Sequence, residues 1–341
     1  MTTTRRSVIT ALAATPALFL AGRNSLAGEA LKISHQFPAG SDTSGDFRHR
    51  LCETFAKELA KRSNGALTAN IYPGSSLMKV NAQFSAMRKG ALDFSLLPLP
   101  YAGGEVPELN IALMPGLVTS YEQGYAWKTA EVGKALTELL AAKGIIIVTW
   151  VWQAGGAASR NVPIIEPDDV KGLKFRGGSR EMDMVAKAAG AATLSLPSSE
   201  TYAAMQTGAV DVVTTSATSL ISFRLQEVSK HLTISKAGKS YWFMLEPLLM
   251  SKAVFDKLPK DQQDLIMTIG TEMEKVALAG ARGDDAQVSE AYIKAGATVH
   301  DLTDAALAKW VALARTTAWK DYAAKNEACA KLIQLAEKVT V

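Results

Sequence analysis

A short pattern that occurs twice constrains the fold of this chain more than any other feature. Residues 86–93 read AMRKGALD and residues 204–211 read AMQTGAVD, so five positions are identical and a sixth is Leu or Val. Upstream, residues 71–75 (IYPGS) have a counterpart in residues 195–199 (SLPSS). Each copy is typical of a strand, a turn, a helix ended by a left-handed glycine, and a second strand. The recurrence predicts two similar lobes, and chance recurrence of a common strand and helix unit is the alternative.

Apolar periodicity elsewhere alternates between strand-like and helical. Strands are expected at residues 31–37, 67–72, 92–97 and 144–152, and a helix is expected from Phe47 until Asn64 and Gly65 stop it. This alternation predicts an α/β fold with a largely parallel sheet. The long polar and alanine-rich stretch at residues 261–294 predicts a helix that crosses both lobes, with a pair of surface helices as the alternative.

The first 27 residues are typical of a cleaved export signal rather than a fold element. Arg5 and Arg6 precede an uncharged run at residues 7–22, and residues 25–27 (SLA) form a small-x-small cleavage pattern. The twin-arginine and general secretory routes both stay open. Without this leader the formal charge falls from +4 to +1, because Arg5, Arg6 and Arg23 are lost. We therefore expect an exported protein in the periplasm, without the basic patch that nucleic-acid binding requires.

The chain lacks the motifs of common enzyme classes. It has no G-x-S-x-G, no phosphate-binding loop and no dinucleotide fingerprint, and its four histidines supply no metal-ligand set. No metal and no cofactor are expected. The two cysteines, Cys52 and Cys329, lie in helical patterns where buried free thiols are common, and a disulfide between them is the alternative.

One arginine stands at the end of a short predicted strand. Arg176 follows the apolar run of residues 170–175, then Gly177 and Gly178 permit close backbone approach, and Ser179 is a suitable helix N-cap. A strand end of this kind faces the crevice where open α/β folds bind ligands, and the guanidinium fork fits a carboxylate. Composition alone favours a solvated or structurally paired arginine.

Several ordered motifs resemble those of one transport family. Residues 167–176 read PxDVKGLKFR, residues 200–211 read ExYxAMQxGxVD, and similar family segments match at residues 106–109, 113–115 and 248–252. Together they resemble a substrate-binding protein of the TRAP (tripartite ATP-independent periplasmic) transporters, that is, solute-binding protein family 7, which is similar to dicarboxylate-binding proteins. The resemblance implies two α/β lobes of the periplasmic binding protein fold, a hinge, and a long helix spanning both lobes.

The resemblance also implies a function, partners and boundaries. An organic acid is captured between lobe I (residues 28–153 and about 242–280) and lobe II (residues 154–241 and about 281–341). It is then delivered to an integral membrane permease driven by an ion gradient. Arg176 falls on the family's carboxylate-binding arginine.

We expect a monomer and no enzyme activity. A sensor-linked binding protein is an alternative, and Asp211 is interpreted as structural, like its repeat counterpart Asp93, rather than as a catalytic base.

Departures from the family pattern narrow the expected ligand. Gly156 stands where many members have a second arginine, Arg160 is displaced from that place, and hydroxyl side chains replace an expected amide. These features predict a monocarboxylate with an apolar or aromatic body, and a dicarboxylate or an oxoacid is the alternative. The expected ligand-binding residues are Arg176, Gln153, Trp152, Thr215, Ser216, Tyr241, Trp242 and Phe37. For each aromatic residue, packing in the core or hinge is the alternative.

Overall fold

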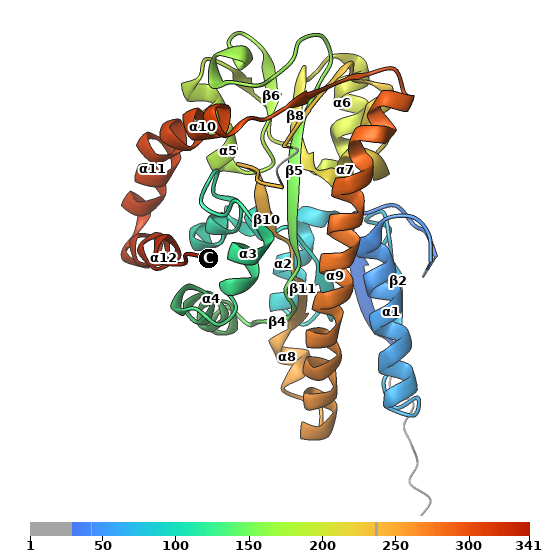
Figure 1. Cartoon of the computed structure of the whole chain (residues 1–341). Helices are drawn as coiled ribbons and strands as arrows, with labels where there is room; N and C mark the ends of the chain where they lie inside the picture. The colour runs from blue at the N-terminus through green and yellow to red at the C-terminus, as the bar shows by residue number, and fades with distance from the viewer. Residues whose placement is uncertain (1–28, 42, 236–237) are drawn as a thin grey trace, which may run out of the picture.

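Two sheets form the framework of the protein in this computed structural model, which describes residues 29–41, 43–235 and 238–341 (Figure 1). The predicted export signal lies outside the described residues. The first sheet has the order β2 (Ala69–Tyr72), β1 (Leu31–His35), β3 (Phe94–Leu96), β11 (Leu248–Ser251), β4 (Ile145–Thr149). The second has the order β12 (Thr298–Asp301), β9 (His231–Ile234), β5 (Trp152–Ser159), β8 (Val212–Ser216), β6 (Lys174–Arg176), β7 (Ala192–Thr193), and β10 (Phe243–Leu245) also pairs with β5.

The sequence repeat corresponds to a structural repeat. In the first sheet β1 lies between β2 and β3 with parallel pairing, and in the second β6 lies between β7 and β8 in the same way. The connecting helices are α1 (Phe47–Arg62) and α2 (Val80–Arg88) in one unit, and α5 (Arg180–Ala188) and α6 (Thr201–Thr207) in the other. After α2 and α6, Gly90 and Gly208 have φ values of 69° and 74°, the left-handed conformation that the repeat predicts.

The aspartate that closes each repeat has the same structural role in both copies. Asp93 accepts a hydrogen bond from the backbone N–H of Lys32 at 2.7 Å, and Asp211 accepts one from that of Lys174 at 2.9 Å. Each bond ties the start of one strand to the start of its parallel neighbour. The structural interpretation of Asp211 is therefore confirmed.

The sheets are less parallel than expected. β11 is antiparallel to β3 and β4, and β5 is antiparallel to β8 and β9, so each sheet has an antiparallel strand in the same relative place. The single strand predicted at residues 144–152 is wrong. The chain turns at Trp150 and Val151, where β4 of the first sheet ends and β5 of the second begins. Alternation within one strand therefore cannot place Trp150 and Trp152 on a common face.

One helix packs on both sheets. The 35-residue helix α9 (Lys260–Lys294) contacts α1 and β4 in the first unit, and α7 (Ala217–Ser222), β5 and β12 in the second. Two of its glycines permit this close packing. A Cβ atom at Gly270 would lie 2.2 Å from the carbonyl oxygen of Val148, and one at Gly280 would lie 2.7 Å from the Phe47 side chain. The predicted spanning helix is confirmed.

The hinge region is tied together by one phenol. Tyr121, in α3 (Tyr121–Ala126), donates a hydrogen bond to Asp285 of α9 at 2.6 Å and accepts one from the backbone N–H of Ala154 in β5 at 3.2 Å. Burial raises the pKa of Asp285 to about 7, although the hydrogen bond from Tyr121 opposes this. α3, α9 and the hinge strand β5 therefore meet at this point.

The C-terminal helices pass from one unit to the other (Figure 1). α10 (Asp304–Thr316) and α11 (Ala318–Lys325) contact α5, whereas α12 (Glu327–Glu337) contacts α4 (Glu131–Ala142) beside the first sheet. The other short helices are α8 (Lys252–Phe255), η1 (Leu99–Ala102), η2 (Pro107–Leu113), η3 (Pro167–Val170), η4 (Ser198–Glu200) and η5 (Leu225–Glu227). The lobe boundaries given from the sequence stay a prediction.

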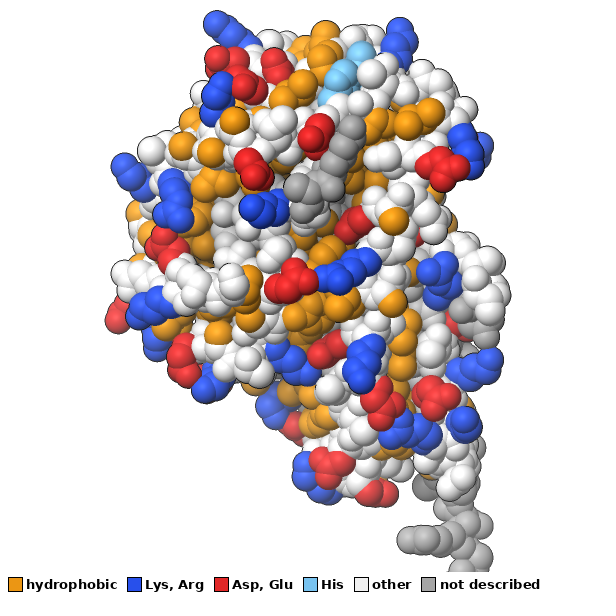
Figure 2. All heavy atoms as spheres, viewed as in Figure 1, with side chains coloured by type: hydrophobic (Ala, Val, Ile, Leu, Met, Phe, Trp, Pro, Cys, Tyr) orange, Lys and Arg blue, Asp and Glu red, His pale blue; other side chains and the backbone are white. Residues whose placement is uncertain are grey.

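The face of the molecule shown in Figure 2 has no large patch of one charge. Figure 2 shows basic and acidic side chains interspersed over the face in view. Cys52 and Cys329 are both buried and free. None of the helices in the described part of the chain has both the length and the hydropathy that a bilayer span requires.

Asp93→Ala and Asp211→Ala should each lower the free energy of unfolding by about 1.5–3 kcal/mol, because each leaves a strand N–H without its charged acceptor. Urea denaturation measures the loss. Asp264→Ala, which removes an exposed acid of α9 paired with Lys260, is the control and should change stability by under about 1 kcal/mol. Ligand affinity should be unchanged in Asp211→Ala, and a large loss of binding without a loss of stability would contradict the structural role.

Candidate functional site

The strand β6 and its neighbours hold the Arg176 side chain in the interior. The guanidinium donates from Nε to the carbonyl oxygen of Leu196 at 3.0 Å, and from Nη1 to that of Thr214 at 3.0 Å. Nη2 donates to the hydroxyl groups of Tyr101 at 3.0 Å and Ser198 at 3.2 Å. These bonds use four of the five N–H groups of an arginine. The residue is 1% exposed, so the solvated interpretation that composition favoured is wrong.

The charge of Arg176 has no acidic partner in direct contact. All four acceptors are neutral oxygens, and none of the ion pairs found among the described residues includes Arg176. Asp183 lies close enough to feel this charge, but it accepts from the backbone N–H of Gly177, and burial raises its pKa to about 6. A buried cation without a paired anion is costly, which favours an anionic ligand at this position.

Comparison of the two repeats shows that the fold does not require an arginine here. Ile33 pairs with Phe94 and Phe175 pairs with Val212, and both partners directly follow the repeat aspartate. Ser34 is therefore the counterpart of Arg176 in the first unit. Its hydroxyl is buried and accepts a hydrogen bond from Gln83 at 3.0 Å. A small neutral residue occupies the same place in the first unit, so the shared framework does not itself require a charge at residue 176.

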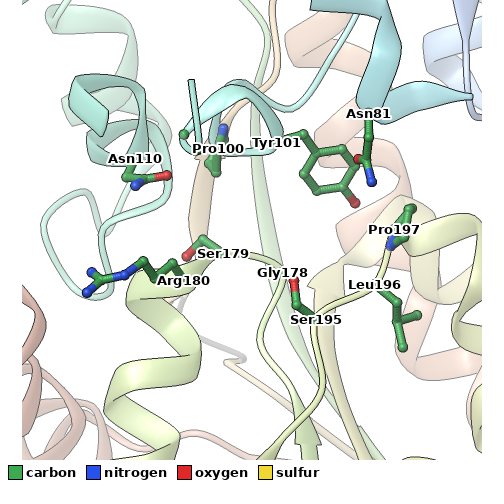
Figure 3. Close-up of a pocket in the computed structure, with 12 residues that line it drawn as sticks. Asn81, Pro100, Tyr101, Asn110, Gly178, Ser179, Arg180, Ser195, Leu196 and Pro197 are labelled. Atoms are coloured by element: carbon green, nitrogen blue, oxygen red, sulfur yellow. The ribbon is translucent and has the colours of Figure 1, made fainter. Parts of the chain in front are cut away.

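A cleft of about 390 Å³ lies beside this arginine, between the two units (Figure 3). Tyr101 and Asn110 line it from the first unit, and Ser179 and the segment of residues 195–197 line it from the second. Tyr101 and Leu196 also hold the Arg176 guanidinium. The cleft is therefore adjacent to the bonds that position Arg176.

A second buried arginine, Arg48, joins the two units from the other direction. It donates from Nε and Nη2 to the carboxylate of Asp46, at 2.9 and 2.6 Å, and from Nη1 to Glu246 at 3.1 Å. Nη2 also reaches the hydroxyl of Ser219 at 3.1 Å, and Nη1 reaches that of Ser216 at 3.5 Å. All five N–H groups are used by the protein itself. Unlike Arg176, Arg48 is fully compensated.

Burial and the charge of Arg48 act in opposite directions on the pKa values of its two acidic partners. Burial raises the pKa of Glu246 to about 7, while the charge of Arg48 opposes this. For Asp46, burial acts in the same direction, but Arg48 holds the pKa below its usual value. Gln153 donates from Nε2 to Glu246, and the Phe37 ring lies 3.6 Å below the Arg48 guanidinium.

Sequence reasoning missed Arg48, Asp46 and Glu246. A signal was present in Glu246, which is the only charged residue in the apolar run YWFMLEPLLM of residues 241–250. A lone acid in a buried run indicates either a buried cation beside it or a protonated carboxyl group. The partner could not be read from the sequence, because Arg48 is 198 positions away.

The structure brings three of the predicted site residues together and separates others. Gln153, Ser216 and Phe37 gather around Arg48 and Glu246. Arg176 contacts β8 at Thr214 and Arg48 contacts it at Ser216, two residues and roughly 7 Å apart along the strand. The two arginines therefore flank the last residues of the same strand. Their role in ligand binding stays a prediction, as it does for the whole predicted set.

The predicted aromatic residues and Thr215 are all buried, in different surroundings. The Trp152 ring packs edge-on against Trp127, with centroids 5.3 Å apart, and Tyr241 stacks on Trp310 at 4.9 Å. Both ring contacts are of the kind that aromatic side chains make in a protein core. Trp242 and Thr215 lie over Gly155, where a Cβ atom would be 2.7 Å from the Trp242 ring and 2.0 Å from the Thr215 carbonyl oxygen.

The absence of a second arginine at Gly156 has a steric cause. A Cβ atom at this position would lie 2.3 Å from the carbonyl oxygen of Thr233 in β9, so no larger residue fits without moving that strand. Arg160 lies at the opposite end of β5 from Gln153, 3.6 Å from Asp211. Among the described residues, no group of histidine, cysteine or acidic side chains could hold a metal ion.

Two sheet units that share the same repeat are joined by adjacent strands and one long helix, and a cation without an acidic partner is buried where they meet. This architecture is typical of a two-lobed solute-binding protein. The model of the bacterial extracellular solute-binding protein family 7 matches residues 39–326. A solute-binding protein of Albidiferax ferrireducens is 65% identical over 309 residues, 91% of each chain. The C4-dicarboxylate-binding periplasmic protein of Rhodobacter capsulatus is 28% identical and covers 89% of this chain and 90% of its own.

Solved structures agree with this family. A TRAP periplasmic solute-binding protein from Rhodoferax ferrireducens, with bound malonate, has a TM-score of 0.89 at 65% identity and covers 91% of this chain and 98% of its own. One from Sulfitobacter, with bound β-D-galacturonate, has a TM-score of 0.81 at 22% identity over 90% of this chain and 99% of its own, which concerns the fold alone. The chain belongs to family 7 of the bacterial extracellular solute-binding proteins. The two-lobed fold and the resemblance to TRAP transport proteins are confirmed.

Arg48→Met should lower the free energy of unfolding by about 3–5 kcal/mol, because it leaves Asp46 and Glu246 buried without their counter-charge. The loss should be smaller at pH 5 than at pH 8, since a protonated Glu246 needs no counter-charge. Urea denaturation at both pH values measures it. Arg62→Met changes another arginine of α1 and breaks an exposed pair with Glu272 of α9, and it should cost at most about 1 kcal/mol. Equal losses in the two variants would contradict the buried network.

Proposed function

We propose that this protein captures a small organic acid between its two lobes, with a carboxylate on Arg176, and delivers it to a TRAP membrane permease. The observation that carries the proposal is the buried Arg176 charge, whose hydrogen bonds all go to neutral oxygens. The fifth N–H of the guanidinium is left for a ligand. The malonate bound by the Rhodoferax relative supports a carboxylate ligand.

The choice between a monocarboxylate and a dicarboxylate depends on whether a second arginine can bind the ligand. All donors of Arg48 are used by protein oxygens, and a longer residue at Gly156 would collide with β9, so of Arg48 and Arg176 it is Arg176 that has an unused donor. This favours a ligand with one carboxylate at Arg176. Its proposed apolar body would contact Trp242 and Phe37, because Trp152 and Tyr241 pack in the core.

A small dicarboxylate is the second candidate, and the relative with bound malonate favours it. Its second carboxylate would need neutral donors, or would have to replace Glu246 beside Arg48. The raised pKa of Glu246 is compatible with such an exchange, since the protonated acid competes less for Arg48.

The proposal also covers the export of the protein, its oligomeric state and its lobe boundaries. We infer that residues 1–27 are removed on export to the periplasm and that the protein acts as a monomer. The lobe boundaries predicted from the sequence belong to the same proposal. A sensor-linked role is distinguished by the neighbouring genes, since adjacent permease genes support transport and an adjacent kinase gene supports sensing.

Arg176→Gln should weaken the binding of malonate by at least about 100-fold, because the charge-assisted hydrogen bonds to the carboxylate are lost. Titration calorimetry of the purified mature chain measures the affinity. Arg160→Gln is the matched control, and its affinity should stay within about twofold of the wild type. Undiminished binding in Arg176→Gln would contradict the carboxylate clamp.

The same calorimetry should compare malonate and succinate with monocarboxylates that carry aliphatic or aromatic groups. Tighter binding of a monocarboxylate would support the first candidate, and binding of dicarboxylates alone would overturn it in favour of the second.

A further inference from the structure

The hydroxyl group of Tyr101 crosses from one unit to the other. Tyr101 belongs to η1, which packs against α2 and η2 of the first unit. Its oxygen lies 3.0 Å from Nη2 of Arg176, 2.9 Å from the backbone nitrogen of Ser198 and 3.1 Å from the Ser198 hydroxyl. Arg176 and Ser198 both belong to the second unit. One side chain therefore links the first unit to the arginine of the candidate site.

The hydrogen atoms in this group can be assigned by counting. The backbone N–H of Ser198 and Nη2 of Arg176 both donate to the Tyr101 oxygen, which uses its two acceptor positions. The phenol proton must then donate to the Ser198 hydroxyl. All three bonds depend on one atom, so a phenylalanine at position 101 would remove them together while keeping the ring.

The position of Tyr101 connects this group to the cleft. Tyr101 lines the cleft together with residues 195–197, and in Figure 3 its ring extends from the first unit toward this segment of the second. Arg176 lies behind these residues and is 1% exposed. Tyr101 and Leu196 both line the cleft and bond to Arg176, so they lie between the cleft and the guanidinium. Breaking the bonds between Tyr101 and Ser198 would separate the two units at this edge and uncover the arginine.

We propose that Tyr101 is an interlobe latch: it fixes the Arg176 guanidinium in the closed protein and slows the release of the bound acid. This inference rests on the proposed function, because it takes Arg176 as the carboxylate site. Tyr101 acts through Arg176 and is a positioning residue. The contacts of Arg48 with Ser216 and Ser219 hold the units together independently, so loss of the latch weakens closure without abolishing it.

The test is the rate of ligand release. Tyr101→Phe should release malonate about 10 to 100 times faster than the wild type, as expected for the loss of hydrogen bonds that include one to a charged group. The association rate should change by less than about threefold, because an open cleft still admits the ligand. Stopped-flow tryptophan fluorescence measures both rates, and small-angle scattering without malonate should show a larger radius of gyration for the variant.

Two further variants separate the latch from a general structural effect. Tyr202→Phe removes a phenol that bonds to Glu227 within the second unit, so both rates should match the wild type. Ser198→Ala keeps the Ser198 N–H and the Arg176 bond to Tyr101, so its release should be accelerated less than in Tyr101→Phe.

Release from Tyr101→Phe at the wild-type rate would overturn the latch, as would an effect in Tyr101→Phe no larger than that in Ser198→Ala. If Arg176→Gln still fails to bind malonate, the proposed function survives either result. Wild-type binding by Arg176→Gln would instead overturn the proposed function itself.

Discussion

Burying a guanidinium group between two lobes requires a counter-charge, and the two buried arginines of this protein meet that requirement differently. Arg48 finds two carboxylates within the chain, Asp46 beside it and Glu246 in the hinge segment. Arg176 finds only carbonyl and hydroxyl oxygens. The first arrangement neutralises the arginine within the chain, and the same guanidinium also bonds to Ser216 and Ser219 of the second unit. The second leaves a buried positive charge without an anion, and this is the observation on which the proposed carboxylate site rests.

The repeated framework explains how the chain can fold with an arginine at position 176 that no acidic group neutralises. The repeat aspartates, the helix-ending glycines and the strand order serve both units alike, so the framework does not depend on residue 176. Ser34 shows what the scaffold alone requires at that place. The two copies differ at this position, because the second unit carries the Arg176 charge and the first unit has the neutral Ser34.

The two units are connected through the hinge strands and one helix. β4 and β5 are adjacent in sequence but belong to different sheets, and α9 packs on both. Close contacts at Gly270 and Gly280 fix the helix on the first unit. Tyr121 and Asp285 tie the helix to β5 at the crossing point. The contacts that Arg48 and Tyr101 make between the units are hydrogen bonds of a few side chains.

Much of this protein was determined by local patterns that the sequence shows directly. The repeat predicted two similar units, the glycine after each helix predicted its end, and the motif around Arg176 predicted the family and the residue of most interest. These features depend on neighbours within about ten positions, where periodicity and turn chemistry act. The strand predicted at residues 144–152 failed because nothing in a continuous apolar run shows that its two halves pair with different sheets.

Only the tertiary structure decided which charges are compensated. Arg48 and Glu246 are 198 positions apart, and Tyr101 and Arg176 are 75 apart. Whether an arginine is neutralised depends on what burial brings within about 4 Å, and no local pattern encodes that distance. The sequence thus located Arg176, and the fold determined that its charge lies buried without an anion.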